Sequence, residues 1–360
     1  MKTCESSRPR KWLKRLLIIL LVFIIANPTV LMPAATVIIY ESIFNRRYET
    51  LDYMEFSVSD FEDLRVERSD FDSQGQLLAG YKYSGAETAE PKGLVVLAHG
   101  LGGGGHNAYM PMINEFVSAG YLVFAYDAAG NDNSTGRVGG LPRGIVALDN
   151  AISHAKTLPE YSGLPIVLFG HSWGAFSSAN VLNLHPDIRA AALISGFNES
   201  EDMLGFYSRS YVGGFADLTM PYLSLYERLK FGKEYTSISA LSGFEATEAE
   251  ILIVHSTDDG TVPPDCGYDD YLLEYSSDPR FTFIEYSDQG HVRLMYSAAS
   301  DLAAEELNRE FEVWLSDNGD REIAEVKAEF MAENLDLVLC FEPDPELVSA
   351  IVELYGSACK

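Results

Sequence analysis

The chain has 360 residues, of which 47% are hydrophobic, so it can bury a large core and is not expected to be disordered as a whole. Its formal net charge is −27 at pH 7, although six of its 26 basic side chains lie within the first fifteen residues. A body this acidic repels nucleic acid, so nucleic acid is excluded as a partner. The four cysteines form no C-x-x-C pair and no Cys/His cluster, so no zinc or other metal site is expected.

The first element in chain order is an uncharged segment at residues 16–40. As a helix it would be about 37 Å long, enough to cross a hydrocarbon core of about 30 Å. Basic residues are more numerous before it than after it, which predicts a single-pass membrane anchor with everything after Tyr40 outside the cytoplasm. The alternative is a cleaved signal peptide with its apolar core at 16–26 and the cut near Ala34-Ala35, which would make the protein secreted.

The body of the chain alternates between apolar strands and helices. A hairpin is expected at 61–83, around a turn at 72–76. Continuously apolar runs predict buried strands at 93–98, 121–126, 166–169, 190–195, 250–254 and 281–286. Helices are expected at 107–119, 144–158, 297–315 and 321–334, and a last one starts at Asp344-Pro345. This alternation predicts an α/β fold with a mainly parallel sheet and helices on both faces.

Residues 197–248 follow the strand at 190–195, which is the sixth when the two hairpin strands are counted. They interrupt the alternation with short helical pieces rich in phenylalanine and tyrosine. One interpretation is a small satellite core. The other is a helical lid whose aromatic underside shapes a pocket for an acyl or other hydrophobic substrate, and both can hold.

The most informative motif is Gly170-His171-Ser172-Trp173-Gly174, which matches G-x-S-x-G directly after the apolar run 166–169. A serine on such a sharp strand-to-helix turn presents its hydroxyl at the start of a helix. Main-chain N–H groups and the helix dipole favour negative charge there. Ser172 is therefore a candidate nucleophile.

A serine hydroxyl needs a base to accept its proton and a carboxylate to orient that base. His291 follows the last strand, and an acidic loop follows the preceding one, so the order Ser172, Asp259, His291 fits this architecture. Asp258 competes with Asp259 for the role of the acid. His171 is expected to point away from the hydroxyl and to support the turn.

The strand at 93–98 ends in His99-Gly100-Leu101 and a run of four glycines. No G-K-[ST] follows, so a phosphate cradle is not favoured. The run instead predicts a turn that carries a main-chain N–H toward Ser172. His99 and His106 are expected to support this turn, and Asp127 to brace its own loop.

Taken together, these segments resemble the α/β-hydrolase superfamily, and within it the bacterial serine aminopeptidase and monoacylglycerol-lipase-like group. The resemblance covers roughly residues 60–315 and implies a triad of Ser172, His291 and Asp259. It also implies an oxyanion hole from the N–H groups of Leu101 and Trp173, and neither a metal nor an organic cofactor. Two features depart from the pattern: Ser256 stands where glycine is usual, and the glycine run is long.

The predicted organisation has five parts: a basic flank with an anchor or signal peptide (1–45), a first part of the hydrolase core (46–196), the lid (197–248), a second part of the core (249–315), and a C-terminal helical extension (316–360). The predicted function is hydrolysis of a carboxylic ester or related acyl bond, with a small ester, an acyl lipid or a short peptide as substrate. The alternatives are an aminopeptidase-like amide hydrolase and a membrane-anchored binding protein without turnover.

Overall fold

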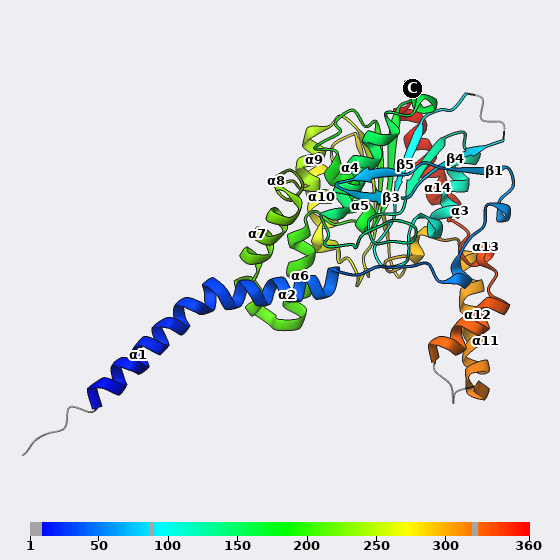
Figure 1. Ribbon diagram of the computed structural model, residues 1–360. Coiled ribbons are helices and arrows are strands. Elements are labelled where there is room, and N and C mark those ends of the chain that lie inside the picture. The colour runs from blue at the N-terminus through cyan, green and yellow to red at the C-terminus, as the bar shows by residue number, and fades with distance from the viewer. Residues whose placement is uncertain (1–8, 87–89, 319–322) are drawn as a thin grey trace, which may run out of the picture.

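The computed structural model describes residues 9–86, 90–318 and 323–360 (Figure 1). Its centre is an eight-stranded sheet with the strand order β1-β4-β6-β5-β7-β8-β9-β10. β1 pairs antiparallel with β4, and β4 with β6, whereas all later neighbours are parallel. The strands are β1 (Leu64–Arg68), β4 (Gly80–Gly85), β5 (Leu94–Ala98), β6 (Leu122–Tyr126), β7 (Ile166–His171), β8 (Ala190–Ile194), β9 (Glu250–Ser256) and β10 (Phe281–Tyr286).

The expected hairpin is present, and a second, smaller hairpin is nested inside it. β1 and β4 form its outer pair, and a smaller hairpin of β2 (Phe71–Ser73) and β3 (Gln76–Leu78) lies between them in the chain. The inner turn is made by Gln74 and Gly75, which both have positive φ values, 52° and 79°.

Side chains of β5 alternate between two cores, one on each face of the sheet. Leu94 and Val96 belong to the larger core, and Val95 and Leu97 to the other. The larger core is covered by α4 (Arg143–Ala155), α5 (Trp173–Val181), α9 (Ala240–Ala246) and α10 (Tyr268–Tyr275), and the other by α3 (Met110–Ser118) and α14 (Pro345–Ala358). The predicted parallel sheet with helices on both faces is confirmed.

The segment between β8 and β9 is helical, as its composition predicts. It contains α6 (Ser200–Val212), a 3₁₀ turn (Gly213–Leu218), α7 (Met220–Phe231), α8 (Lys233–Thr236) and α9. α6 and α7 lie beside each other at one end of the molecule, next to the N-terminal helix α2 (Figure 1). This insertion therefore stands at the border between the sheet and the N-terminal segment.

The N-terminal segment differs from the expected anchor. It forms α1 (Pro9–Ala26), a π-helical turn (Asn27–Leu31) and α2 (Met32–Phe44), and α1 projects away from the sheet (Figure 1). Each helix of the described part of the chain is too short or too polar to cross a membrane. The uncharged run 16–40 is divided between two helices, because α1 ends at Ala26 and a π-helical turn separates it from α2. The expected placement of later residues outside the cytoplasm stays a prediction.

α2 packs on the inserted helix α7. Tyr40 and Phe44 are buried in the larger core, and the Tyr40 hydroxyl donates a hydrogen bond of 2.6 Å to Glu227. Beside it, Tyr226 donates to Glu41 at 2.7 Å, and Lys230 pairs with Glu41. The C-terminal half of the N-terminal segment is thus part of the folded body.

The C-terminal part has two roles in the fold. α11 (Ala298–Asn318) and α12 (Ile323–Asn334) share a small core of their own and form an arm beside the sheet (Figure 1). After α13 (Leu337–Cys340), α14 returns to the sheet and buries Leu347, Ile351 and Tyr355. As the sequence predicts, Asp344 caps this helix, accepting hydrogen bonds from the N–H groups of Glu346 and Leu347.

The candidate active site

Ser172 occupies the sharp turn between β7 and α5, with φ 57° and ψ −118°. Such a positive φ is unfavourable for a side chain other than glycine, so the surrounding packing must enforce it. Gly170 and Gly174, the two glycines of the motif, allow main chain to pack closely against this turn. A Cβ on Gly170 would lie 2.4 Å from the carbonyl oxygen of Gly174, and a Cβ on Gly174 would lie 1.9 Å from that of Ala98. Both positions require glycine because main chain approaches them this closely.

The three residues expected to act together form one hydrogen-bonded chain. His291 Nε2 lies 2.8 Å from Ser172 Oγ, and His291 Nδ1 lies 2.7 Å from Asp259 Oδ2. All three follow the carboxyl ends of parallel strands, β7, β9 and β10, which meet at one edge of the sheet. Asp259 is buried, whereas Ser172 and His291 remain partly exposed. The hydroxyl is therefore accessible while its supporting carboxylate is shielded from water.

The environment of Asp259 keeps its carboxylate ionised. Its second oxygen, Oδ1, accepts hydrogen bonds of 2.9 Å from the N–H groups of Thr261 and Val262. Burial alone would raise the pKa of Asp259, but the hydrogen bond and charge of His291, together with these two amides, lower it. A buried ionised carboxylate on Nδ1 fixes the histidine tautomer whose Nε2 can accept a proton from serine.

Asp258, the competing acid, holds a different part of the same site. Its Oδ1 accepts hydrogen bonds from the Gly290 N–H at 3.0 Å and from the Ser256 hydroxyl at 2.5 Å. The Ser256 hydroxyl in turn accepts from the N–H of Gln289 at 3.3 Å. Ser256, which stands where glycine is usual, thus connects the loop of Asp259 to the loop of His291.

The two expected oxyanion donors lie on either side of Ser172 in the fold. Trp173 begins α5, and Leu101 follows β5, the parallel neighbour of β7. Within the described residues, neither main-chain N–H donates a recorded hydrogen bond. The long glycine run has positive φ at Gly102 (103°) and Gly104 (90°). These glycines turn the loop sharply.

The glycine-rich loop is fastened at its C-terminal end by two aspartates from the loop after β6. The Gly105 N–H donates to Asp132 Oδ2 at 2.7 Å, and Asp132 also accepts from the N–H and hydroxyl of Thr50, at 2.6 and 2.8 Å. The next residue, His106, donates its main-chain N–H to Asp127 at 3.0 Å. The sequence did not predict that Asp132 and Thr50 would hold this loop. The only indication was that residues 127–134 form a polar turn.

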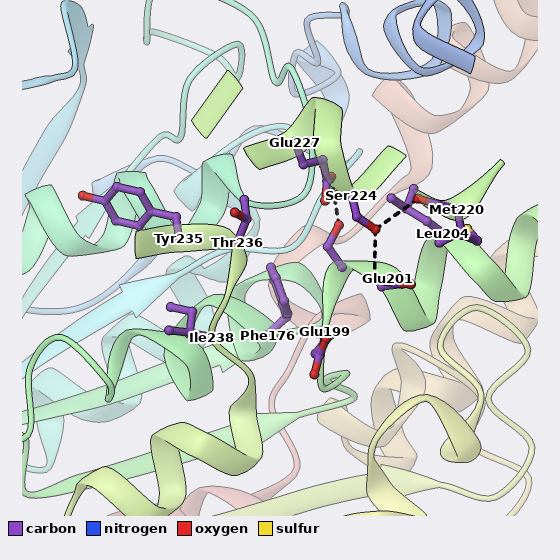
Figure 2. Close-up of a pocket in the computed structure, with 11 residues that line it drawn as sticks. Phe176, Glu199, Glu201, Leu204, Met220, Ser224, Glu227, Tyr235, Thr236 and Ile238 are labelled. Carbon is purple, nitrogen blue, oxygen red and sulfur yellow. Dashed lines mark hydrogen bonds between the residues drawn. The ribbon is translucent and has the colours of Figure 1, made fainter. Parts of the chain in front are cut away.

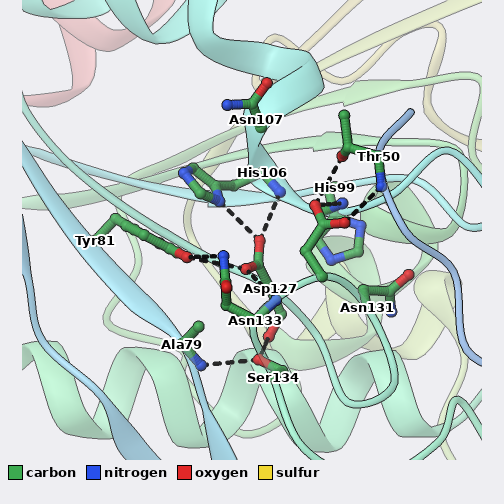
Figure 3. Close-up of polar contacts among 12 residues, drawn as sticks. Thr50, Ala79, Tyr81, His99, His106, Asn107, Asp127, Asn131, Asn133 and Ser134 are labelled. Atoms are coloured by element: carbon green, nitrogen blue, oxygen red, sulfur yellow. Dashed lines mark hydrogen bonds and ion pairs between the residues drawn. The ribbon is translucent and has the colours of Figure 1, made fainter. Parts of the chain in front are cut away.

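Asp127 braces its loop, as the sequence predicts (Figure 3). His106 Nδ1 lies 2.7 Å from its Oδ1, and the Tyr81 hydroxyl and the Asn133 N–H donate to its Oδ2 at 3.1 and 3.3 Å. Burial by itself would raise the pKa of Asp127, but the hydrogen bonds and charge of His106 lower it. The two histidines expected to support this turn do so, since His99 Nε2 accepts from the N–H of Ala128 at 2.9 Å.

His171, the neighbour of Ser172 in the chain, points away from the Ser172 hydroxyl as expected. Its two ring nitrogens lie 2.8 Å from the Tyr109 hydroxyl and 3.0 Å from the main-chain oxygen of His291. Burial, followed by the nearby charge of His291, lowers the pKa of His171 to about 3. The ring is therefore neutral at ordinary pH and does not act as the base for Ser172.

A small cavity of about 30 Å³ lies between α5 and the inserted helices (Figure 2). Phe176 and Glu227 are among the described residues that line it, and Ser172, Asp259 and His291 are not. Its size suits a water molecule rather than a substrate. In the described part of the chain, no group of three or more His, Cys, Asp or Glu side chains could hold a metal ion, and Cys266, Cys340 and Cys359 are free thiols.

The chain is similar to known proteins both in sequence and in structure. The family model for serine aminopeptidase S33 matches residues 89–232, which include Ser172 but neither Asp259 nor His291. A monoglyceride lipase homolog from monkeypox virus is 30% identical over 106 residues, or 29% of this chain. That match spans only 38% of the viral protein.

Among solved structures, an esterase from Pyrococcus furiosus superposes with a TM-score of 0.52 at 18% identity, over 76% of this chain and 97% of the esterase. Another crystal form of it gives 0.53 at 17% identity, over 75% and 98%. At this identity the likeness establishes the fold. The family model and the viral relative, each over less than half of the chain, support the expected hydrolase class. The chain therefore has the α/β-hydrolase fold, and its residues 89–232 match the serine aminopeptidase S33 family model.

Proposed function

We propose that the protein is a serine hydrolase that cleaves a carboxylic ester or a related acyl bond through an acyl-enzyme. One observation carries this proposal: the continuous hydrogen-bonded chain from Ser172 Oγ through His291 to the buried Asp259, with distances of 2.8 and 2.7 Å. Such a chain gives a serine hydroxyl the base and the oriented carboxylate that it needs to become a nucleophile.

In the first step, Ser172 Oγ attacks the substrate carbonyl carbon as His291 Nε2 takes its proton. The carbonyl oxygen becomes an oxyanion, which the N–H groups of Leu101 and Trp173 stabilise. Loss of one such donor typically costs about 100- to 1,000-fold in rate. The histidine then gives its proton to the leaving alcohol, so that an acyl-serine remains. In the second step, His291 removes a proton from water as the water oxygen attacks the acyl-serine. The acid is then released as His291 returns this proton to Ser172 Oγ.

The inserted helices support an acyl substrate. They expose several large apolar side chains near α6 and α7, among them Tyr211, Phe215 and Leu229. The Tyr207 hydroxyl on α6 donates a hydrogen bond of 2.9 Å to Thr261 O, beside the acid Asp259. We infer that this insertion acts as a lid and that the substrate is a small ester or an acyl lipid. Relatives named as an esterase and a lipase homolog are consistent with this class.

A second candidate is hydrolysis of an amide bond, as in an aminopeptidase, which the serine aminopeptidase family model favours. The same triad can perform either reaction, so the substrates must discriminate. We expect p-nitrophenyl esters of short fatty acids to be hydrolysed with a higher kcat/KM than p-nitroanilides of amino acids. The opposite order would favour the peptidase.

A fluorophosphonate probe tests the proposal, because only an activated serine reacts readily with it. The full chain should be used, since Tyr40 and Phe44 belong to the core. We expect labelling of the wild type, no labelling of Ser172→Ala, and normal labelling of Ser178→Ala. Ser178 is a matched control because it is buried in α5 and its hydroxyl has no hydrogen-bond partner in the described structure. A folded wild-type protein that neither labels nor hydrolyses esters would instead favour a binding protein on the same fold.

A further inference from the structure

The glycine-rich loop at 100–105 carries Leu101, the first proposed oxyanion donor, and is called the oxyanion loop below. It begins at Gly100, whose N–H and carbonyl oxygen are both held by hydrogen bonds. Its N–H donates a hydrogen bond of 2.9 Å to the Tyr109 hydroxyl. Its carbonyl oxygen lies 2.7 Å from His99 Nδ1, which donates because a carbonyl can only accept. Because Leu101 follows directly, the main chain that carries the first oxyanion donor is fixed by these two contacts.

The Tyr109 hydroxyl continues the connection to His171. The two residues lie 62 positions apart in the chain, and Tyr109 Oη is 2.8 Å from His171 Nδ1. A Cβ on Gly100 would lie 2.9 Å from that hydroxyl and 3.2 Å from His171 Nδ1. The sequence therefore has glycine at this position because the tyrosine and the histidine approach its main chain this closely.

The other nitrogen of His171 completes the connection to the histidine of the triad. His171 Nε2 lies 3.0 Å from the main-chain oxygen of His291, 120 positions later. That oxygen also accepts a hydrogen bond of 3.2 Å from the Ser195 hydroxyl, which follows β8. The main chain of His291 is thus held by side chains from the ends of β7 and β8, independently of the contacts of its ring.

One arrangement of protons satisfies every member of this chain. The His291 carbonyl can only accept, so His171 Nε2 carries the proton and Nδ1 is the acceptor. Tyr109 then donates its hydroxyl proton to Nδ1, and its oxygen accepts from the Gly100 N–H. Because burial keeps the His171 ring neutral, this arrangement persists across ordinary pH.

We propose that Tyr109 and His171 are positioning residues, which fix the oxyanion loop at Gly100 relative to the main chain of His291. This proposal rests on the proposed function and deepens it. The oxyanion donor at Leu101 and the base at His291 act on the same carbonyl group in the same step. Their relative position therefore determines the rate of acyl transfer, and an error of about 1 Å can cost about 100-fold. Neither positioning residue needs to touch the substrate.

The test compares Tyr109→Phe with Tyr355→Phe. Both substitutions remove a hydroxyl that contacts main chain, since the Tyr355 hydroxyl donates to Leu168 O at 2.7 Å, in the middle of β7. Tyr109→Phe also removes the contact to His171. Each protein is titrated with the fluorophosphonate to count reactive serines, and kcat and KM for p-nitrophenyl butyrate are expressed per labelled site. Because only folded sites label, partial unfolding does not affect this kcat.

We expect Tyr109→Phe to lower kcat per labelled site by about 10- to 100-fold with KM unchanged within about twofold. Tyr355→Phe should leave both constants near those of the wild type. His171→Gln, which keeps an amide donor that can reach the His291 carbonyl, should retain more kcat than His171→Leu.

Two results would overturn the proposal. One is a kcat per labelled site in Tyr109→Phe equal to that of Tyr355→Phe, which would make Tyr109 merely structural. The other is equal kcat in His171→Gln and His171→Leu. Both results require an active wild type, so they differ from a failure of the proposed function, in which the wild type itself neither labels nor turns over the ester.

Discussion

Asp258 and Asp259 are neighbours in the chain, and their carboxylates bind successive residues of one loop. Asp259 Oδ2 lies 2.7 Å from His291 Nδ1, and Asp258 Oδ1 accepts the N–H of Gly290 at 3.0 Å. The first contact orients the imidazole ring, and the second fixes the main chain just before it. The adjacent acids therefore have separate tasks, which makes them a natural pair for comparison.

Asp259→Asn should lower kcat for p-nitrophenyl butyrate by roughly 10⁴-fold, because an amide favours the wrong tautomer of His291. Asp258→Asn keeps an oxygen that can accept from Gly290, and we expect a loss of less than about tenfold. Steady-state kinetics of the two variants, with circular dichroism as a check of folding, measures the difference. Equal losses would mean that the acids share one role.

The oxyanion loop should respond to the contact at its other end. Asp132→Asn removes one of the two oxygens that hold Gly105 and Thr50 while keeping the size of the side chain. We expect kcat to fall by about tenfold with little change in KM, because the contact positions the loop and does not bind substrate.

Asp63→Asn is the matched control for Asp132→Asn. Asp63 is exposed and, like Asp132, has a positive φ; the values are 61° and 33°. Asparagine tolerates such conformations, so both variants should fold. A rise in KM at constant kcat in Asp132→Asn would contradict the positioning role.

The convergence of Ser172, Asp259 and His291 was predictable from the sequence, because the geometry of a parallel sheet brings the ends of its strands together. Ser172, Asp259 and His291 lie far apart in the chain, but each directly follows an apolar strand that could be recognised from its composition. Strands that run in parallel end at the same edge, so residues after them converge without any knowledge of side-chain packing.

The contacts that hold the site were not predictable in the same way. Tyr109 lies in a 3₁₀ turn, and its partners are main-chain or ring atoms of residues 9 and 62 positions away. No residue type or spacing predicts such a contact, because the contact depends on how closely this 3₁₀ turn approaches Gly100. Sequence reasoning could state that His171 supports the turn but not what it touches.

The two ends of the chain show what the helical period adds to composition alone. The absence of charge at 16–40 suggested a membrane span, yet the spacing of Thr36, Tyr40 and Phe44, four residues apart, is that of one helix face, and all three are buried. The same spacing at Leu347, Ile351 and Tyr355 places α14 against the sheet. Attention to this period would have indicated both contacts.

Gly174→Ala should disrupt the fold at the nucleophile. Its Cβ would lie 1.9 Å from Ala98 O and 2.9 Å from His99 O, so α5 or β5 would have to move. Overpacking of this kind typically costs about 1–3 kcal/mol, and because both obstacles are main chain we expect a loss at the upper end of that range or beyond. Urea unfolding of the full chain measures the change in unfolding free energy.

Gly356→Ala is its control. No atom lies within 4 Å of a Cβ at this position in α14, and alanine is favoured over glycine in a helix by up to about 1 kcal/mol. This variant should be as stable as the wild type or more so. A neutral Gly174→Ala would show that the close approach of β5 and α5 relaxes readily.

Tyr40 and Glu227 join the N-terminal helix to the inserted helix α7. Glu227 is buried and accepts hydrogen bonds from Tyr40 at 2.6 Å and from Ser200 at 2.9 Å. Burial raises the pKa of Glu227 to about 7, with a smaller contribution from Glu201; the two hydrogen bonds and the charge of Lys230 act in the opposite direction.

The stability of the chain should therefore depend on the ionisation of Glu227. Because its folded-state pKa of about 7 lies above the ordinary value of 4.5, the folded chain holds this proton more tightly than the unfolded chain. The stabilising contribution is complete below pH 4.5 and is lost as the pH rises through 7; a shift of this size corresponds to at most about 3 kcal/mol. Glu227→Gln stays neutral, so its stability relative to the wild type should increase between pH 5 and pH 8. Urea unfolding of the full chain at both pH values measures this, with the exposed Glu333→Gln as control. An equal difference between Glu227→Gln and wild type at both pH values would mean that Glu227 titrates alike in the folded and unfolded chain.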